Sequence, residues 1–235
     1  PTADVSRLVS LPSCQTRALV FQPQVFRPAS YVLTSFSQLN THTRQAPHVQ
    51  SDDELPSGIE VGILFHELLR EIFQHHIEPE VSWLQRRLLG SVLEGFEQPV
   101  LAILQQALGV HLGAFSLAEV DREKCLVEVP FYSKEEGNRF VQGAVDLFFE
   151  YKDKFYLLDW KSNLLENYSN KALQQEISSQ GYTLQAKMYT AAALRHLGIN
   201  QAKFGGFFFV FLRGLQNSET HGVVCIEANK GDSHA

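Results

Sequence analysis

Two aspartates and a lysine within residues 146–163, DLFFEYKDKFYLLDWKSN, have the types and spacing best suited to chemistry. Asp159 and Lys161 are two positions apart in an apolar run, so on a strand both side chains project from one face. If residues 152–153 form a two-residue hairpin loop, Asp146 lies directly across from Asp159 on that face. A four-residue loop gives the same register. The two carboxylates would then face each other with Cβ atoms about 5 Å apart.

Facing carboxylates repel each other unless a cation lies between them. Carboxylate oxygens are hard ligands that suit Mg²⁺ or Mn²⁺. Lys161 beside such an ion could orient or deprotonate a water, or stabilise charge that develops on a phosphate. A D-x-K pattern alone occurs by chance and a strand aspartate can be an edge charge, but opposed aspartates destabilise an ordinary sheet. The pattern favours metal-dependent hydrolysis of a phosphodiester.

Two further residues could complete a metal site. His66 lies in an amphipathic helical pattern with Gly62 one turn earlier, where the missing side chain would let another element or a metal approach. The alternative is a histidine at a helix–sheet contact that bonds to backbone. Glu128 alternates with Val127 and Val129 on the strand before the hairpin, and it is either a third acidic ligand or a solvated residue.

A third group of residues could contact a nucleic acid. Tyr182, Gln185 and Tyr189 share one helix face, from which they could bind phosphates, stack on bases or pack in a core. Arg195 and Arg213 are the basic residues that we expect to face a phosphate backbone.

The hydrophobic pattern predicts an α/β fold in which a sheet is flanked by helices. Residues 30–39 form a short segment with capping residues, 41–57 a loop and 164–180 a polar connection. Helices are predicted from residue 57 for about four turns and over 81–89, 91–108 and 181–197. Strands are predicted over 125–132, 139–151, 155–160, 204–212 and 222–227, the first three antiparallel. We expect an arm or linker over 1–29, the functional domain over 30–228 and a frayed tail over 229–235.

Composition narrows the function classes. The 235 residues include 44% hydrophobic and 20% charged residues, and the formal net charge is −6. An acidic balance argues against a protein that coats nucleic acid by charge alone, and it suggests that another domain or subunit supplies much of the DNA path. Three distant cysteines, Cys14, Cys125 and Cys225, cannot form a zinc site or a four-cysteine iron–sulfur cluster by themselves. We expect reduced thiols in a cytoplasmic protein with no membrane span and no ATP-binding G-x-x-x-x-G-K-[ST] loop.

Five motifs in order resemble the RecB-type nuclease domains of the PD-(D/E)XK superfamily, over most of residues 30–226. They are G-I-L-F-H-E-L-L at 62–69, G-A-V-D at 143–146, L-L-D-W-K-S-N at 157–163, G-Y-T-L-Q-A-K-M-Y-T at 181–190 and F-F-F-V-F-L-R-G at 207–214. The resemblance implies the superfamily's restriction-endonuclease-like core, a mixed central sheet with a helical N-terminal part. It includes no four-cysteine set, unlike the iron–sulfur nucleases of the AddB type.

The resemblance also assigns roles to the candidate residues. It implies that His66, Asp146, Asp159 and the backbone carbonyl of Trp160 bind Mg²⁺, and that Lys161 positions or activates the attacking water. Trp160 stands where the family usually has tyrosine, a change that leaves the carbonyl in place. Gln185 and Tyr189 match the Q-x-x-x-Y helix that supports the site, and Glu128 matches an acidic position.

As a whole, the resemblance implies a nuclease domain from a longer helicase-nuclease subunit, the beta subunit of exodeoxyribonuclease V. That subunit works with RecC and RecD at DNA double-strand breaks before recombination. We expect the domain to cut DNA without ATP and to prefer single strands. The alternatives are the nuclease domain of an AddA-type subunit and a non-catalytic docking module with a nuclease-like fold.

Overall fold

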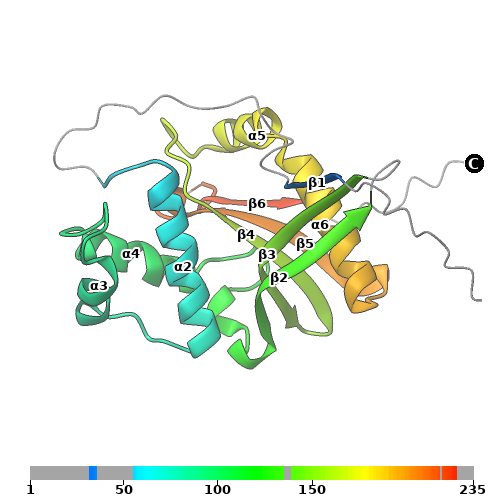
Figure 1. Ribbon diagram of the computed structural model, residues 1–235, viewed down its shortest axis with the longest axis horizontal. Coiled ribbons are helices and arrows are strands. Elements are labelled where there is room, and N and C mark those ends of the chain that lie inside the picture. Colours follow the sequence, from blue (N-terminus) through cyan, green and yellow to red (C-terminus); the bar gives the residue numbers. More distant parts are fainter. Residues whose placement is uncertain (1–31, 36–54, 135–138, 218, 227–235) are drawn as a thin grey trace, which may run out of the picture. The chain divides into compact units, whose positions relative to one another are not determined.

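A six-stranded mixed sheet runs through the centre of the fold in the computed structural model, which describes residues 32–35, 55–134, 139–217 and 219–226 (Figure 1). The strands are β1 (Val32–Ser35), β2 (Cys125–Lys134), β3 (Arg139–Tyr151), β4 (Lys154–Lys161), β5 (Phe204–Phe211) and β6 (Val223–Ile226). The path is β1-β3-β4-β5-β6, and β2 pairs with β3. β1 is parallel to β3 and β4 is parallel to β5, whereas the other neighbours are antiparallel.

Helices cover both faces of this sheet and create two hydrophobic cores (Figure 1). Side chains of α2 (Ile59–His75), α3 (Val81–Leu88) and α4 (Glu97–Leu108) form the first core with one face. Side chains of α5 (Asn170–Ser179) and α6 (Tyr182–Leu197) form the second core with the other face. Short 3-10 turns lie at Leu117–Glu119, Arg122–Lys124, Gln201–Lys203 and Leu212–Gly214. The predicted α/β class is confirmed, and none of the described helices is long and apolar enough to cross a membrane.

The predicted two-residue hairpin between β3 and β4 is confirmed. Lys152 and Asp153 have φ values of 48° and 59°, the left-handed backbone that a type I′ turn requires at both central positions. The twist of this turn matches the right-handed twist of the strands, so the register from Tyr151↔Lys154 follows from local chain chemistry.

Three segments differ from the sequence-based expectations. The helix predicted over 91–108 begins only at Glu97, because Gly95 has a left-handed φ of 88° that interrupts the helical path. The connection predicted over 164–180 contains α5, which Ser169 caps by accepting a hydrogen bond from the Ala172 N–H. The segment 30–39 contributes β1, a four-residue strand whose partner lies about 100 residues away in the chain. The boundaries predicted at 29 and 229 lie outside the described residues.

The arrangement of partners along β3 leaves an opening that positions the site. β2 occupies one edge of β3 along residues 140–149, while β1 and β4 share the opposite edge. β1 pairs with residues 139–142 and β4 pairs with residues 147–151. On that edge, the backbone of residues 143–146 has no strand partner within the described part of the chain. Asp146 lies at the end of this opening, next to the last residue that pairs with β4.

Gly143 lies in the opening, and we expect Gly143→Ala to lower the free energy of unfolding by about 1–3 kcal/mol. A Cβ there would come within 2.6 Å of Phe131 Cζ and 3.0 Å of the Tyr189 hydroxyl, so a buried ring must shift. Urea denaturation measures the change, and Gly109→Ala is the control because its Cβ would meet only ordinary contacts at 3.7 Å. Equal effects of the two substitutions would contradict this account of the packing.

Candidate active site

Three acidic residues lie in one row across neighbouring strands: Glu128 on β2, Asp146 on β3 and Asp159 on β4. The backbone pairs Val127↔Leu147 and Val129↔Val145 bracket Glu128 and Asp146, but these two residues are not themselves paired. The β3–β4 ladder likewise ends at Leu147↔Leu158, one position short of the two aspartates. The register predicted from the hairpin therefore holds up to the acidic row, where the regular sheet is interrupted.

The interruption changes the direction in which the strands point their side chains. Glu128 has a left-handed φ of 46°, which is uncommon for a residue other than glycine. Val127 packs into the first core and Val129 into the second, although a regular strand would place both on one face. Leu147 and Val145 on β3 are divided between the two cores in the same way. Side chains from the helices on both faces of the sheet can therefore contact the acidic row.

Asp146 connects β3 to β4 and to α2 through its side chain. Its Oδ2 accepts a hydrogen bond of 2.7 Å from the backbone N–H of Trp160, which replaces the missing strand pairing. Its Oδ1 lies 3.2 Å from Nδ1 of His66. Burial is the largest single effect on the pKa of His66 and lowers it, but the charge and hydrogen bond of Asp146 together with the charge of Asp159 raise it more, so this pKa lies above the usual 6.5.

Asp159 is buried on the α6 side, with 4% of its surface exposed. Gln185 Nε2 donates to Asp159 Oδ1 at 2.8 Å, and Lys161 Nζ lies 2.5 Å from Oδ2 as an ion pair. Oδ2 has no further hydrogen-bond donor among the described residues. Burial raises the pKa of the Asp159 carboxyl, whereas the Lys161 ammonium acts to lower it. A buried carboxylate oxygen with only an ammonium beside it has the chemistry of a cation ligand.

Lys161 is held by one polar and two aromatic neighbours besides Asp159. Its Nζ donates to Gln185 Oε1 at 3.1 Å and lies 4.1 Å from the centre of the Tyr182 ring and 5.2 Å from that of Phe209. Burial lowers the pKa of Lys161, but Asp159, Tyr182 and Asp146 together raise it more, so the pKa lies above its usual value. The side chain is therefore a fixed positive charge, better suited to hold a water or phosphate oxygen than to remove a proton.

The predicted shared face of α6 is present in the structure. Tyr182, Gln185 and Tyr189 all point to the sheet, and the Tyr182 hydroxyl donates to Asn163 Oδ1 at 3.3 Å. Tyr189 packs edge-on against Phe131 at 4.4 Å, and burial raises its pKa to about 12. Gln185 reaches both Asp159 and Lys161, while Tyr182 and Tyr189 are packed in the core beside them rather than presented on the surface.

Helix α2 crosses the same region from the other face and contacts in turn the residue that follows β4, then β3 and then β2. The missing side chain of Gly62 lets Ser162 approach, because a Cβ there would lie 2.8 Å from Ser162 Oγ. His66 contacts Asp146 one turn later, and Arg70 Nε lies 3.5 Å from Glu128 Oε1 another turn on. Glu128 is half exposed and paired with Arg70, so its role as a metal ligand stays a prediction.

The two predicted phosphate-facing arginines have different surroundings. Arg195 is exposed on α6, and its contact with DNA stays a prediction. Arg213 directs Nε to the carbonyl of Ser162 and its two terminal nitrogens to the carbonyls of Leu55 and Pro56. Three of the five N–H donors of the guanidinium therefore bond to the protein's own backbone, which gives Arg213 a structural role, while its contact with phosphate stays a prediction.

Sequence reasoning did not identify two residues next to the site. Asn163 Nδ2 donates to Glu176 Oε1 at 2.8 Å, and Glu176 is a buried carboxylate on α5. Asn163 directly follows the D-W-K-S motif, so its position was a signal. Glu176 offered none, because the helix that carries it was not predicted.

The donor set at the acidic row fits a divalent metal ion. Carboxylate oxygens of Asp146 and Asp159, one of them buried beside only an ammonium, are hard ligands, and the His66 imidazole lies next to Asp146. Within the described residues, no three His, Cys, Asp or Glu side chains are gathered closely enough to hold an ion as they stand. Asp146 itself contacts His66 and the Trp160 N–H.

A titration of the His66–Asp146 pair follows from this geometry. Because the pKa of His66 is raised in the fold, the pair stabilises the metal-free protein fully below pH 6.5, and this contribution is lost as the pH rises through the folded pKa. We expect His66→Gln to lower the free energy of unfolding in EDTA more at about pH 6 than at about pH 8.5. Urea denaturation at both pH values measures the free energy of unfolding. The control is His75→Gln, because His75 is exposed on the same helix. A loss that is the same at both values would contradict the pairing.

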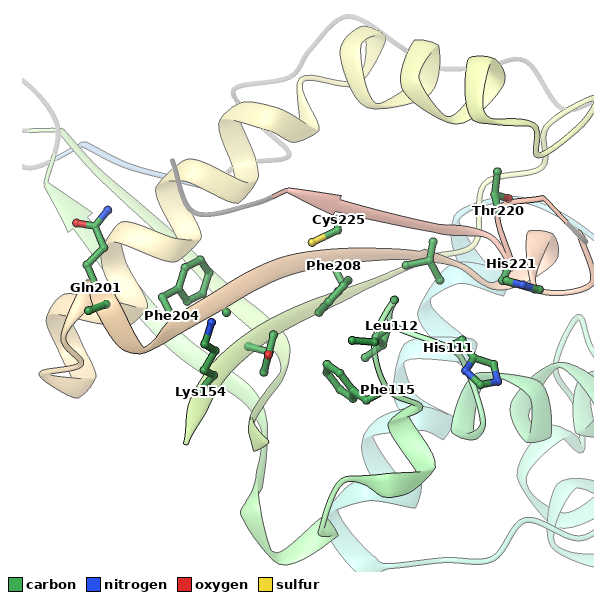
Figure 2. Close-up of a pocket in the computed structure, with 16 residues that line it drawn as sticks. His111, Leu112, Phe115, Lys154, Gln201, Phe204, Phe208, Thr220, His221 and Cys225 are labelled. Carbon is green, nitrogen blue, oxygen red and sulfur yellow. The ribbon is translucent and has the colours of Figure 1, made fainter. Parts of the chain in front are cut away.

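A large cavity lies away from the row of acidic residues. It has a volume of about 1310 Å³ and is lined by the first half of β4, by β5 and β6 and by residues 111–115 (Figure 2). Lys154 and Tyr156 of β4 face this cavity, whereas Asp159 and Lys161 lie toward the other end of the same strand. Figure 2 shows aromatic and aliphatic side chains together with His111 and His221 around it.

A family model of the PD-(D/E)XK nuclease superfamily matches residues 28–231. The chain belongs to the PD-(D/E)XK nuclease superfamily. This membership confirms the predicted restriction-endonuclease-like core, since the D-x-K strand, its aspartate partner and the flanking helices are all in place. Nucleases of this superfamily generally use divalent metal ions, in agreement with the donor set.

Curated relatives connect this PD-(D/E)XK chain to RecB proteins. It is 31% identical over 199 residues to the RecBCD enzyme subunit RecB of Chlamydia muridarum, covering 80% of this chain and 19% of the relative. The RecB subunit of Chlamydia trachomatis is 34% identical, covering 69% of this chain and 17% of the relative. That of Escherichia coli is 26% identical, covering 76% and 19%. The chain spans about a fifth of the length of these relatives and is a RecB-like nuclease domain.

Proposed function

We propose that this domain is a Mg²⁺-dependent deoxyribonuclease of the RecB type, which hydrolyses DNA phosphodiester bonds during double-strand-break processing and recombinational repair. The observation that carries the proposal is the buried Asp159–Lys161–Gln185 cluster beside the Asp146–His66 pair, at the point where the sheet is interrupted. A buried ion pair adds little net stability, because the desolvation of both charges offsets their attraction, so a structural role alone explains this cluster poorly.

Asp146, Asp159, His66 and the backbone carbonyl of Trp160 would hold the metal ion. When bound, a divalent ion lowers the pKa of a coordinated water and neutralises charge on the scissile phosphate. Mg²⁺ is the first choice, with Mn²⁺ as an alternative that accepts the same oxygen ligands. The cysteines suggest no iron–sulfur cluster, and we propose that this part of the chain binds no ATP.

The protein's own groups would position the reactants. Lys161, as a fixed cation, would orient the attacking water and stabilise a phosphate oxygen as it gains charge. Gln185 keeps Lys161 and Asp159 aligned, because its amide donates to the carboxylate and its carbonyl accepts from the ammonium. Tyr182 and Tyr189 restrict the motion of these side chains from the α6 side.

The substrate and partners are proposed from the relatives. We infer DNA as substrate, with single strands preferred because a chain with a net charge of −6 attracts the highly charged duplex only weakly. The relatives are subunits of the RecBCD enzyme, so RecC, RecD and the helicase part of a longer polypeptide are the proposed partners, in the cytoplasm. An AddA-type subunit is the alternative, and a docking module is disfavoured because Asp146, Asp159 and Lys161 are all present.

The test is a cleavage assay on labelled single-stranded and duplex DNA, with Mg²⁺, Mn²⁺ or EDTA and without ATP. The proposal predicts metal-dependent cleavage that is faster on single strands. Calorimetry with Mn²⁺ and no DNA provides a separate measure of metal binding. A well-folded chain that neither binds the ion nor cuts either substrate would refute the nuclease proposal in favour of a docking module.

A further inference from the structure

Arg213 joins two segments that carry different parts of the proposed active site. Nε donates to the Ser162 carbonyl at 3.2 Å and Nη1 to the Leu55 carbonyl at 3.2 Å, while Nη2 donates to the Pro56 carbonyl. Ser162 directly follows Lys161 at the end of β4, and Leu55 and Pro56 lie just ahead of α2. One half-buried guanidinium therefore connects the strand of Asp159 and Lys161 to the helix of His66.

A second contact brings the same two segments together. Gly62, in the first turn of α2, approaches Ser162 so closely that a Cβ would lie 2.8 Å from Ser162 Oγ. His66 follows one turn later and lies 3.2 Å from Asp146. Because a helix is rigid over one turn, the separation of α2 from Ser162 determines where the His66 imidazole lies relative to Lys161 and the two aspartates.

We infer that Arg213 is a positioning residue, which sets the distance between the His66 side and the Lys161 side of the active site. This inference rests on the proposed function. It assigns the guanidinium to the protein's own backbone and not to DNA phosphate, because each of its three nitrogens donates to a backbone carbonyl. A lysine cannot reproduce the contact, since it offers one compact ammonium where the guanidinium presents a planar fork.

The test compares Arg213→Ala and Arg213→Lys with the wild-type chain on single-stranded DNA. We expect kcat to fall about 10–100-fold in both variants, the range seen when a group that orients a metal ligand is removed. KM and the salt dependence of binding should stay unchanged, and added guanidinium ion should restore part of the kcat of Arg213→Ala. If Arg213 instead contacted phosphate, its substitution would raise KM and reduce the slope of the salt dependence by about 1. That result would overturn the inference.

Arg122→Ala is the matched control for loss of a guanidinium that bonds to backbone. Arg122 donates to the Ile77 carbonyl at 3.4 Å and pairs with Glu78, at a distance from the acidic row. The Arg122→Ala substitution should leave kcat unchanged once the rates are corrected for the folded fraction. An equal fall in kcat for Arg122→Ala and Arg213→Ala would mean a general effect on stability and would overturn the inference.

A second pair of variants tests the same junction if Arg213→Ala does not fold. Gly62→Ala should push α2 away from Ser162 and lower kcat, and Ser162→Ala in the same chain should restore it by removing the Oγ that the methyl group meets. No recovery in the double variant would overturn the inference.

Mn²⁺ affinity, measured by calorimetry without DNA, should weaken about tenfold in Arg213→Ala. This readout separates failure of the positioning role from failure of the nuclease proposal, because it requires no cleavage.

Discussion

Lys161→Ala is expected to lower the rate of single-stranded DNA cleavage about 10²–10³-fold, the loss typical when one group that stabilises transition-state charge is removed. Lys161 is the cation nearest Asp159, and Gln185, Tyr182 and Phe209 hold its ammonium in place. A methyl group at this position can neither orient a water nor stabilise a phosphate oxygen. The measurement is single-turnover cleavage with saturating Mg²⁺.

Lys161→Ala also leaves a buried carboxyl without its cation. Because burial already raises the pKa of Asp159, we expect this carboxyl to take up a proton in the variant, so that the loss of stability is greater at neutral than at acidic pH. The loss is greater at neutral pH because a carboxyl whose pKa is raised in the fold stabilises the folded state only while it is protonated. Circular dichroism at assay temperature establishes the folded fraction before rates are compared.

Lys154→Ala provides the matched control for this substitution. Lys154 begins the same strand, is exposed, and lines the large cavity rather than the acidic row. Its removal should leave the cleavage rate unchanged. If Lys154→Ala and Lys161→Ala slowed cleavage equally, the chemistry would not be located at the end of β4.

Asp146→Asn and Asp146→Ala are expected to abolish most cleavage alike, by about 10²–10³-fold, but to differ in stability. Asp146 Oδ2 accepts the backbone N–H of Trp160, a residue that is 2% exposed. Alanine leaves this buried N–H without an acceptor, which costs about 1–3 kcal/mol. Asparagine retains a carbonyl oxygen that can accept the bond, so its free energy of unfolding should stay closer to that of the wild type.

Urea denaturation in EDTA and Mn²⁺ calorimetry measure the two effects separately. Asp153→Asn is the control, because it also replaces a carboxylate on this hairpin but lies in the turn, where asparagine accepts the left-handed backbone. Asp153→Asn should change neither activity nor stability appreciably. Metal affinity that survives in Asp146→Asn would exclude Asp146 as a ligand.

Much of the site could be predicted because its parts follow short-range rules. The spacing of Asp159 and Lys161 places both on one strand face, and the turn residues 152–153 align β3 with β4. The helix that carries His66 and the helix that carries Gln185 were both visible as periodic apolar patterns. These features depend on neighbours within a few positions, where backbone geometry is repetitive.

Other features depend on contacts between distant segments. The hairpin register predicted two aspartates directly across from each other, but the structure interrupts the ladder there and directs Asp146 to the Trp160 N–H and to His66. Glu128 pairs with Arg70 on α2, which no strand pattern could indicate. Strand β1 was missed for the same reason, since a four-residue strand gains its stability from a distant partner. Helix α5 does carry a local signal, its Ser169 N-cap, which the prediction of a polar connection did not use.

The sequence by itself determined which residues could do chemistry, the strand and helix that carry each of them, and the hairpin that brings Asp146 toward Asp159. The tertiary structure decided which atoms those residues contact: Asp146 with His66, Glu128 with Arg70, and Arg213 with the backbone at Ser162 and residues 55–56. The reason is physical. Turn chemistry and side-chain periodicity depend on residues only a few positions apart, so they can be predicted from short stretches of sequence. Hydrogen bonds between segments 51 to 158 positions apart depend on how helices pack across the sheet, which only the folded chain defines.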